Sequence, residues 1–146
     1  MNMSKLMDII FICSFIIFNI SVSALYIATK LGNMVLVQVC GAIVLSLIIP
    51  FTITLLGYTK EKPEKRVIIS HAFILFYLFL ELSLDYILKI PFREILAIHV
   101  LYIIVFYAAM FSMIGVSFSK NRKMGFVVII TFLILIGCLV YYLLPF

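Results

Sequence analysis

The chain has 146 residues, of which 66% are hydrophobic and only 12% are charged, and its formal net charge is +5. Soluble domains carry about 45–50% apolar and about 25% charged residues, so this chain lacks the polar side chains that cover a globule in water. The composition excludes a soluble enzyme, a nucleic-acid-binding domain and a disordered regulator, and it predicts an all-α polytopic membrane protein.

Five long apolar segments follow one another along the chain, separated by short stretches that carry charge. Each is at least about 19 residues long, which is enough for a helix to cross the roughly 30 Å hydrocarbon core of a bilayer. The runs lack the in/out alternation of barrel strands, so helices are favoured. We expect a single transmembrane domain over residues 1–146, a five-helix bundle with spans at residues 8–29, 34–58, 67–88, 95–118 and 126–144.

Basic residues are distributed unequally between the two sides that these spans separate. Eight lie on the side of the N-terminus, and three lie on the opposite side, Lys30, Lys89 and Arg93. Short loops rich in Lys and Arg stay in the cytoplasm, so we expect the N-terminus inside and the C-terminus outside the plasma membrane of a prokaryote. The inner side suits anionic lipids and not nucleic acid. Its basic residues are Lys5 together with the lipid-facing candidates Lys60, Lys62, Lys65, Arg66, Lys120, Arg122 and Lys123.

The first segment has a second interpretation, as a cleaved signal peptide. Lys5 precedes an apolar run, and the small residues Ser21, Ser23 and Ala24 follow as they do before a cleavage site. Asp8 interrupts the positively charged start, so a retained span is favoured. Cleavage would leave four helices with both ends outside and would not change the remaining orientation.

The second segment contains a proline near its middle. Pro50 removes one backbone hydrogen bond and should kink the helix, with the hydroxyl of Thr52 or Thr54 or a neighbouring helix satisfying the freed carbonyl. Such kinks act as hinges in some transporters and more often only shape the packing. Three uncharged polar residues of the first two spans are expected to form hydrogen bonds between helices: Asn19, Gln38 and Ser46.

The third segment carries ionisable residues within a span. Glu81 and Asp85 are four residues apart, so they share one face of a helix. His71 lies on the same stripe but near the inner end, and we expect it to be a separate feature. Asp85 precedes Lys89 by one turn, the favourable order for an ion pair, and we expect Lys89 and Arg93 to take part in ion pairing at the outer interface.

The fourth segment follows after a short connection that contains Pro91. A tight hairpin centred there would place Asp85 opposite His99 and Glu81 opposite Tyr102. Glu81 lies about eight residues, or roughly 12 Å, inside the boundary, where an ionised carboxylate costs at least about 2.5–3.5 kcal/mol. We therefore expect Glu81 to face the interior of the bundle, where desolvation and the nearby Asp85 favour its protonated form.

Three interpretations of Glu81, Asp85 and His99 remain open. In the first they are structural: Asp85 pairs with Lys89 or His99, and protonated Glu81 binds Tyr102. In the second they line a wet path open to the outside in a small proton- or cation-linked transporter or channel. In the third they hold the metal of a membrane metalloenzyme, which is least favoured because only one histidine lies at the right depth.

Two observations would discriminate between these interpretations. Transport requires Glu81 to line a polar cavity between helices, whereas a cap by Tyr102 within tight apolar packing would favour the structural role and a non-catalytic membrane subunit or accessory protein. No catalytic residue, metal or cofactor is assigned. Because a bundle this small has little internal volume, a homodimer or a partner membrane protein is a further expectation.

Three cysteines give no sign of covalent or metal chemistry. They lie in three different spans without paired spacing, which predicts neither a disulfide nor a thiolate metal site. They are Cys13, Cys40 and Cys138.

The segment 79–93, FLELSLDYILKIPFR, resembles a stretch of the form FxELxLDYxLKxPFR shared by a family of small multi-span prokaryotic integral membrane proteins of no established activity. The start of the last span at Gly125 and Phe126 is also similar. The shared segment covers 15 of the 146 residues. The resemblance implies a membrane protein with several spans and assigns no functional residue, so it only singles out the hairpin between the third and fourth spans.

Overall fold

The computed structural model describes residues 3–61, 64–89 and 94–145. Within these ranges the chain is helical and contains no strand, which confirms the all-α class. The helices in chain order are α1 (Met3–Lys30), α2 (Met34–Ser46), α3 (Ile48–Glu61), α4 (Lys65–Glu81), the π-helical segment η1 (Leu82–Ile87), α5 (Leu96–Lys120) and α6 (Arg122–Leu143).

Five helical stretches are long and apolar enough to cross a membrane. The second consists of α2 and α3 together, and the third consists of α4 and η1. The five apolar helices predicted from the sequence are therefore present in the described residues. Their bounds are Lys5–Lys30, Met34–Lys60, Lys65–Ile87, Leu96–Lys120 and Arg122–Leu143.

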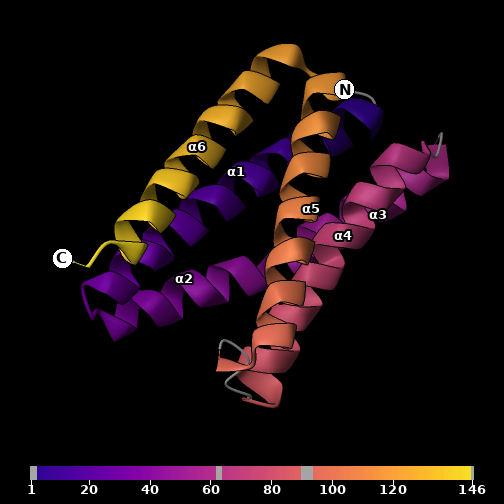
Figure 1. The fold of residues 1–146 in the computed structure, drawn as a ribbon. Helices are drawn as coiled ribbons and strands as arrows, with labels where there is room; N and C mark the ends of the chain where they lie inside the picture. Colours follow the sequence, from indigo (N-terminus) through magenta and orange to yellow (C-terminus); the bar gives the residue numbers. More distant parts are fainter. Residues whose placement is uncertain (1–2, 62–63, 90–93, 146) are drawn as a thin grey trace.

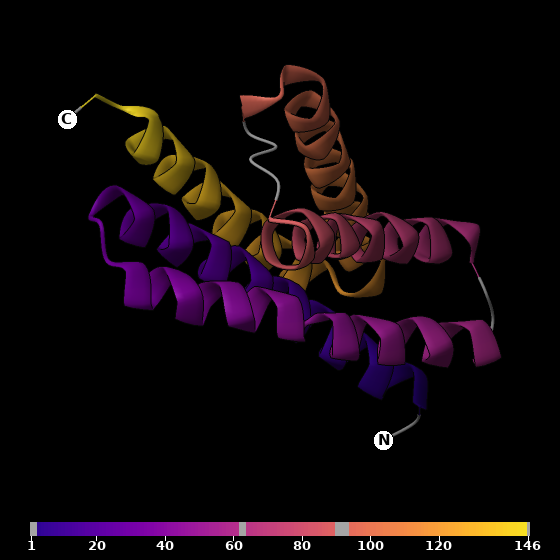
Figure 2. The same cartoon turned by 90° about the horizontal axis from the view of Figure 1, so that it is seen from below.

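Helix α1 is the centre of the bundle, with α2, α3 and α6 packed against it (Figures 1 and 2). Helices α4 and α5 form a hairpin that also contacts α3 and α6. The inner face of α1 carries Phe11, Phe15 and Phe18, which are fully buried at helical spacing. Met110 and Met113 of α5 are also fully buried in this core.

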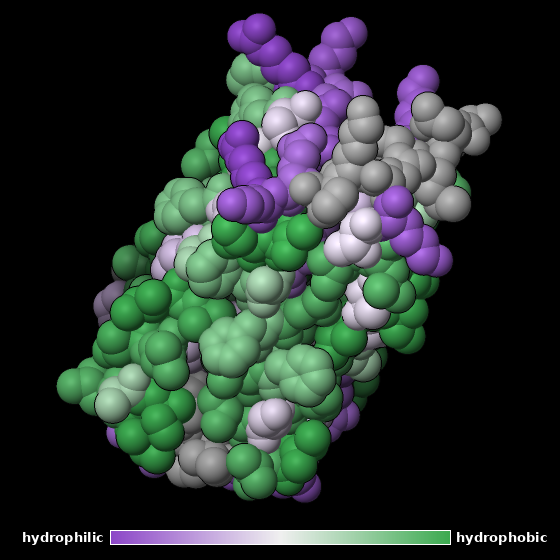
Figure 3. All heavy atoms as spheres, turned by 90° about the vertical axis from the view of Figure 1, so that its right-hand side faces the viewer, coloured by the Kyte–Doolittle hydropathy of each residue, from purple (hydrophilic) through white to green (hydrophobic). Residues whose placement is uncertain are grey.

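The two ends of the bundle differ in charge. The start of α1, the end of α3, the start of α4 and the α5–α6 connection lie together at one end (Figure 1). Hydrophilic side chains gather at this end above a largely apolar flank (Figure 3). Lys62, one of the basic residues expected there, lies outside the described residues. We call this the basic end; its described basic residues are Lys5, Lys60, Lys65, Arg66, Lys120, Arg122 and Lys123.

The second span is interrupted between α2 and α3. The Leu47 N–H bonds to Val44 O at 3.2 Å, which is a tighter turn than in a regular α-helix. Pro50 follows in the first turn of α3, where its missing N–H leaves the carbonyl of Ser46 without its usual helical donor. The hydroxyl of Thr52 donates to Ile48 O at 2.7 Å, so it does not satisfy that carbonyl.

Polar side chains join α1 to α6 in the middle of the bundle. Asn19 Nδ2 donates to Thr131 Oγ1 at 2.9 Å, and both residues are buried. The expected interhelical bond is therefore confirmed for Asn19. The expectation is wrong for Ser46, which is exposed and donates to Ile43 O of its own helix at 2.7 Å, because the α2 face that carries it points away from the bundle. Gln38 is exposed on α2.

Candidate functional site

The last residue of α4 carries the carboxyl group that the sequence singles out. Glu81 is half-buried, and the hydroxyl of Tyr102 on α5 donates a hydrogen bond to Glu81 Oε2. A second bond, 2.7 Å long, joins the hydroxyl groups of Tyr102 and Tyr77. Each phenol has a single hydrogen and Tyr102 uses its own for Glu81, so Tyr77 is the donor to Tyr102. The three side chains form what we call the Glu81 chain.

The Glu81 chain runs from a half-buried carboxyl group into the core. Tyr77 is 4% exposed and its ring makes edge contacts with Phe18 and Phe106, with centroids 5.9 and 5.2 Å apart. The pairing of Glu81 with Tyr102, expected from hairpin geometry, is confirmed. Tyr77 was not among the expected site residues, although it precedes Glu81 by four residues, a spacing that places both on one helical face.

The helix that carries Glu81 changes its winding directly after this residue. In η1 the backbone is π-helical, and the Leu88 N–H bonds to Ser83 O at 2.8 Å, five residues back. Single π-turns inside α-helices occur frequently at functional sites. The prediction from the sequence assumed a regular α-helix through this region, because no residue pattern there indicates the wider π-turn. The site therefore lies where the helix of the third span is irregular.

Asp85 and His99 are placed close to the Glu81 chain along the sequence but are not joined to each other by a hydrogen bond. Asp85 is half-buried in η1, and His99 is half-buried near the start of α5. The Nδ1 atom of His99 is buried and has no hydrogen-bond partner in the described ranges. Asp85 and His99 were expected to lie opposite each other on neighbouring helices, but no hydrogen bond joins their side chains.

Among the described residues no ion pair joins Asp85 to Lys89, and Asp85 is engaged in another interaction. Lys89 lies beyond the end of η1 and adopts a φ of 50°, so it does not follow Asp85 by one regular helical turn. Arg93 and Pro91, which were expected to take part in ion pairing and to form the apex of the hairpin, lie outside the described residues.

Tyr86 of η1 approaches α2 closely. A methyl group added at Gly41 would overlap the hydroxyl oxygen of Tyr86. Gly41 is buried, so the absence of a side chain there allows the phenol to lie against the backbone of α2. The region around Glu81 is thus tied to α5 by Tyr102 and to α2 by Tyr86.

His71, which shares α4 with Glu81, belongs to a different set of contacts, as its depth predicted. Its side chain is fully buried, with Nδ1 2.8 Å from Val67 O and Nε2 2.9 Å from Thr54 Oγ1. The rings of Phe11 and Tyr58 lie against the imidazole, with centroids 5.1 and 5.6 Å away. His71 therefore joins α4 to α3 and α1.

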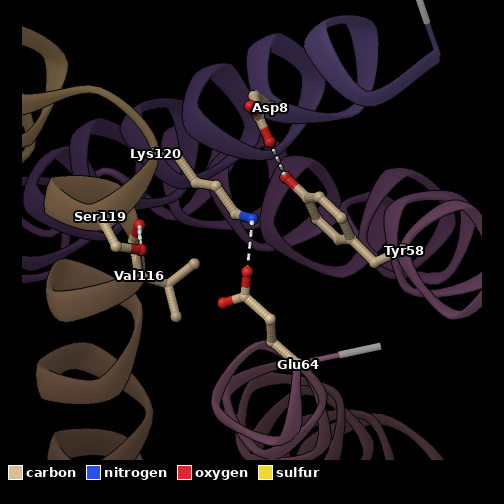
Figure 4. A network of polar contacts seen from close by, with 6 residues as sticks. All are labelled: Asp8, Tyr58, Glu64, Val116, Ser119 and Lys120. Carbon is tan, nitrogen blue, oxygen red and sulfur yellow. Dashed lines mark hydrogen bonds and ion pairs between the residues drawn. The ribbon is translucent and has the colours of Figure 1, made fainter. Parts of the chain in front are cut away.

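A polar network at the basic end was not predicted from the sequence (Figure 4). The Tyr58 hydroxyl donates to Asp8 Oδ1 at 2.6 Å, and Lys120 Nζ lies 4.0 Å from Glu64 Oε1. Lys120 Nζ is also 4.9 Å from the centroid of the Tyr58 ring. These residues come from α1, α3, the start of α4 and α5, and no local pattern indicates such distant pairs.

The described residues hold no group of three or more His, Cys, Asp and Glu side chains that could bind a metal ion. The set Glu81, Asp85 and His99 therefore does not form a ligand cluster in this part of the chain. The metalloenzyme interpretation receives no support from the arrangement of these residues.

The comparisons with known proteins found no relative of this chain. No family model matches the sequence, and no match was found among curated proteins or among solved structures. Any inference about the function of the site therefore depends on the arrangement of its residues.

Proposed function

We propose that the protein spans a cell membrane with the basic end in the cytoplasm and acts there as a small proton- or cation-linked transporter or channel. The five apolar helices and the gathering of basic residues at one end support this orientation. The N-terminus is then inside and the C-terminus outside. The observation that carries the functional proposal is the Glu81 chain.

Glu81 is the ion-binding group in this proposal. A carboxyl group within an apolar span is costly and commonly marks a path for protons or cations. Glu81 is half-buried and ends the α-helical part of the third span, so its carboxyl group lies towards the outer leaflet in this orientation. In this position it can take up a proton or cation from that side.

Tyr102 and Tyr77 extend the site inwards. A hydroxyl group accepts one hydrogen bond while it donates another, so a row of hydroxyl groups can pass a proton along by shifting each hydrogen. The bond between Tyr77 and Tyr102 continues the contact with Glu81 towards the middle of the bundle. The phenols therefore serve as relay groups, and the carboxyl group is the acceptor.

A second candidate function is a non-catalytic membrane subunit or accessory protein. The hydrogen bond from Tyr102 to Glu81 joins α5 to α4, and this is the cap that was expected for a carboxyl group with a structural role. The partial exposure of Glu81 is the observation that favours transport over this role. In this case Glu81 fixes the hairpin that a partner membrane protein or a second copy recognises. The two candidates differ in whether ions move.

Ion flux in liposomes tests the proposal directly. We would measure proton uptake with an internal pH dye between pH 5 and 8, and Na⁺ and K⁺ flux under matched gradients. We expect flux with the unmodified protein and its loss in Glu81→Gln, which keeps the shape and removes the charge. Tyr102→Phe and Tyr77→Phe should lower proton flux while leaving the carboxyl group in place.

Tyr107→Phe is the matched control, because Tyr107 lies on α5 outside the Glu81 chain and packs against Phe106 and Phe111. Its flux should equal that of the unmodified protein. Absence of flux for all three ions with the unmodified protein would contradict transport and favour the accessory role. Equal flux in Glu81→Gln would show that this residue is not the ion-binding group.

A further inference from the structure

Arg66 lies in the first turn of α4 at the basic end, with its guanidinium group against α5. A methyl group added at Gly115 would lie 2.6 Å from Nη2 of Arg66, 3.6 Å from Cζ and 3.8 Å from Nε. The absence of a side chain at Gly115 therefore makes room for the planar guanidinium group along this helix. Although Arg66 is an exposed residue, its charged end has a defined place between α4 and α5.

No acceptor in the described part of the protein binds the N–H groups of this guanidinium group. Among the described residues, Arg66 makes no hydrogen bond or ion pair. The two described acidic side chains at this end have other partners: Asp8 accepts from Tyr58 at 2.6 Å, and Glu64 lies 4.0 Å from Lys120. A fork of N–H donors is thus positioned without an acceptor, next to the exposed Lys65.

The serine hydroxyl groups around Gly115 on α5 do not offer donors in place of Arg66. Ser117 is buried and donates to Met113 O at 2.9 Å. Ser112 and Ser119 lie about one turn away on either side, and they donate to Ala109 O and Val116 O at 3.0 and 2.8 Å (Figure 4 shows the second bond). Their hydrogens are engaged within the helix. The capacity to bind an anion at this point therefore belongs to Arg66 and Lys65.

The position of the group along the helices indicates which anion it meets. Arg66 is the second residue of the candidate span Lys65–Ile87, and Gly115 lies in the last two turns of the span Leu96–Lys120. When these helices cross a bilayer, this is the boundary between acyl chains and headgroups, where lipid phosphates are found. The charge of the surrounding end is positive, which favours an anionic headgroup over a zwitterionic one.

We propose that Arg66, held against α5 at Gly115, binds the phosphate of an anionic phospholipid headgroup, with Lys65 beside it. Guanidinium groups bind phosphate through two parallel N–H···O bonds, and a defined orientation of the fork favours this geometry. The site rests on the membrane orientation proposed above and is independent of ion movement through Glu81. It is a discrete site, in contrast to a general attraction of the basic end to the membrane surface.

Lipid binding to the purified protein in a neutral detergent tests the site. We would titrate phosphatidylglycerol and phosphatidylcholine separately, and count bound lipids by native mass spectrometry. We expect one phosphatidylglycerol to bind at least about tenfold more tightly than phosphatidylcholine, and Arg66→Ala to lose about tenfold of that affinity. Arg66→Lys should recover it only in part, because the charge remains and the fork is lost.

Gly115→Ala is the sharpest variant, because it changes no charge. The three atoms nearest to the added methyl group all belong to the flexible end of the Arg66 side chain, so we expect the fold to persist while the guanidinium group moves and affinity falls at least about threefold. Gly137→Ala is the matched control, since nothing lies within 4 Å of a methyl group there, and its affinity should not change.

Several outcomes would overturn the site. Unchanged phosphatidylglycerol affinity in both Arg66→Ala and Gly115→Ala would show that the lipid does not bind there. A loss in Arg122→Ala or Lys123→Ala as large as in Arg66→Ala would show a general attraction of the basic end. Displacement of the lipid by millimolar inorganic phosphate would assign the site to a free anion and not to a headgroup. Flux through Glu81 can fail without affecting any of these results.

Discussion

The imidazole of His71 is bound to Thr54 across the interface of α3 and α4, with 2.9 Å between Nε2 and Thr54 Oγ1. The other ring nitrogen, Nδ1, lies 2.8 Å from Val67 O, which can only accept, so Nδ1 carries a hydrogen. In the neutral ring Nε2 can only accept, so the single hydroxyl hydrogen of Thr54 is shared between Nε2 and Phe51 O, which lies 3.0 Å from Oγ1. His71 therefore links α4 to α3 through a contact between two fully buried polar side chains.

Replacing Thr54 by Val should destabilise the fold. The substitution keeps the shape of the side chain and leaves the buried Nε2 of His71 without a donor, which costs about 1–3 kcal/mol. Unfolding in detergent, followed by circular dichroism, measures the change. Thr59→Val is the control, because Thr59 is exposed and bonds only to Leu56 O of its own helix. Equal stability of the two variants would show that the contact between Thr54 and His71 contributes nothing.

Substitutions in the Glu81 chain should change the stability of the fold and the ion flux to different extents. Glu81→Gln retains an oxygen that accepts from Tyr102, so its free energy of unfolding should stay within about 0.5 kcal/mol of the unmodified protein. Tyr102→Phe removes the donor to Glu81 and the acceptor for Tyr77, and should cost about 1–3 kcal/mol. The same unfolding measurement tests both. A larger loss in Glu81→Gln than in Tyr102→Phe would contradict this assignment of donor and acceptor.

An alanine at Gly41 should disturb the contact between α2 and η1. Alanine favours a helix over glycine by about 1 kcal/mol, but the added methyl group overlaps the Tyr86 hydroxyl, and overpacking costs about 1–3 kcal/mol. We expect a net loss of stability in Gly41→Ala and its recovery when Tyr86→Phe removes the overlapping oxygen. Gly137→Ala, in open space, should show no loss. Failure of Tyr86→Phe to restore stability would locate the strain elsewhere.

Lys30 should hold the last turn of α6. Its Nζ donates to the carbonyl oxygens of Tyr141 and Leu144, the second at 2.8 Å, and lies 4.4 Å from the centroid of the Tyr141 ring. A cation at a helix C-terminus stabilises it by about 0.3–1 kcal/mol. Lys30→Ala should therefore increase hydrogen exchange in the last turn of α6. Exposed Lys60→Ala should leave that exchange unchanged, and an unchanged rate in Lys30→Ala would contradict the cap.

The sequence was informative wherever the deciding property is local. Five apolar helices follow from the lengths of five apolar runs, because any span must be long enough and must satisfy its backbone polar groups within the helix. The pairing of Glu81 with Tyr102 was also predictable, since a short connection forces two neighbouring helices into an antiparallel hairpin. The short connection limits the registers in which these two helices can pair.

Contacts between residues far apart in the chain were not predictable in this way. In an apolar span every face is hydrophobic, so the pattern does not show which face of a helix meets which neighbour. The pairs Asp8–Tyr58 and Asn19–Thr131 depend on the rotation of α1 against α3 and α6. The rotation is the result of many small packing contributions, each too weak to read from one position.

Composition and the lengths of apolar runs thus determined the all-helical class and the number of long apolar helices, because each of these properties depends on a continuous stretch of the chain. Only the tertiary structure decided that the third span becomes π-helical after Glu81, that His71 faces Thr54 and that Gly115 receives Arg66. The physical reason is that these features arise where two or more helices press on one another, and the fit of their side chains exists only in the folded bundle.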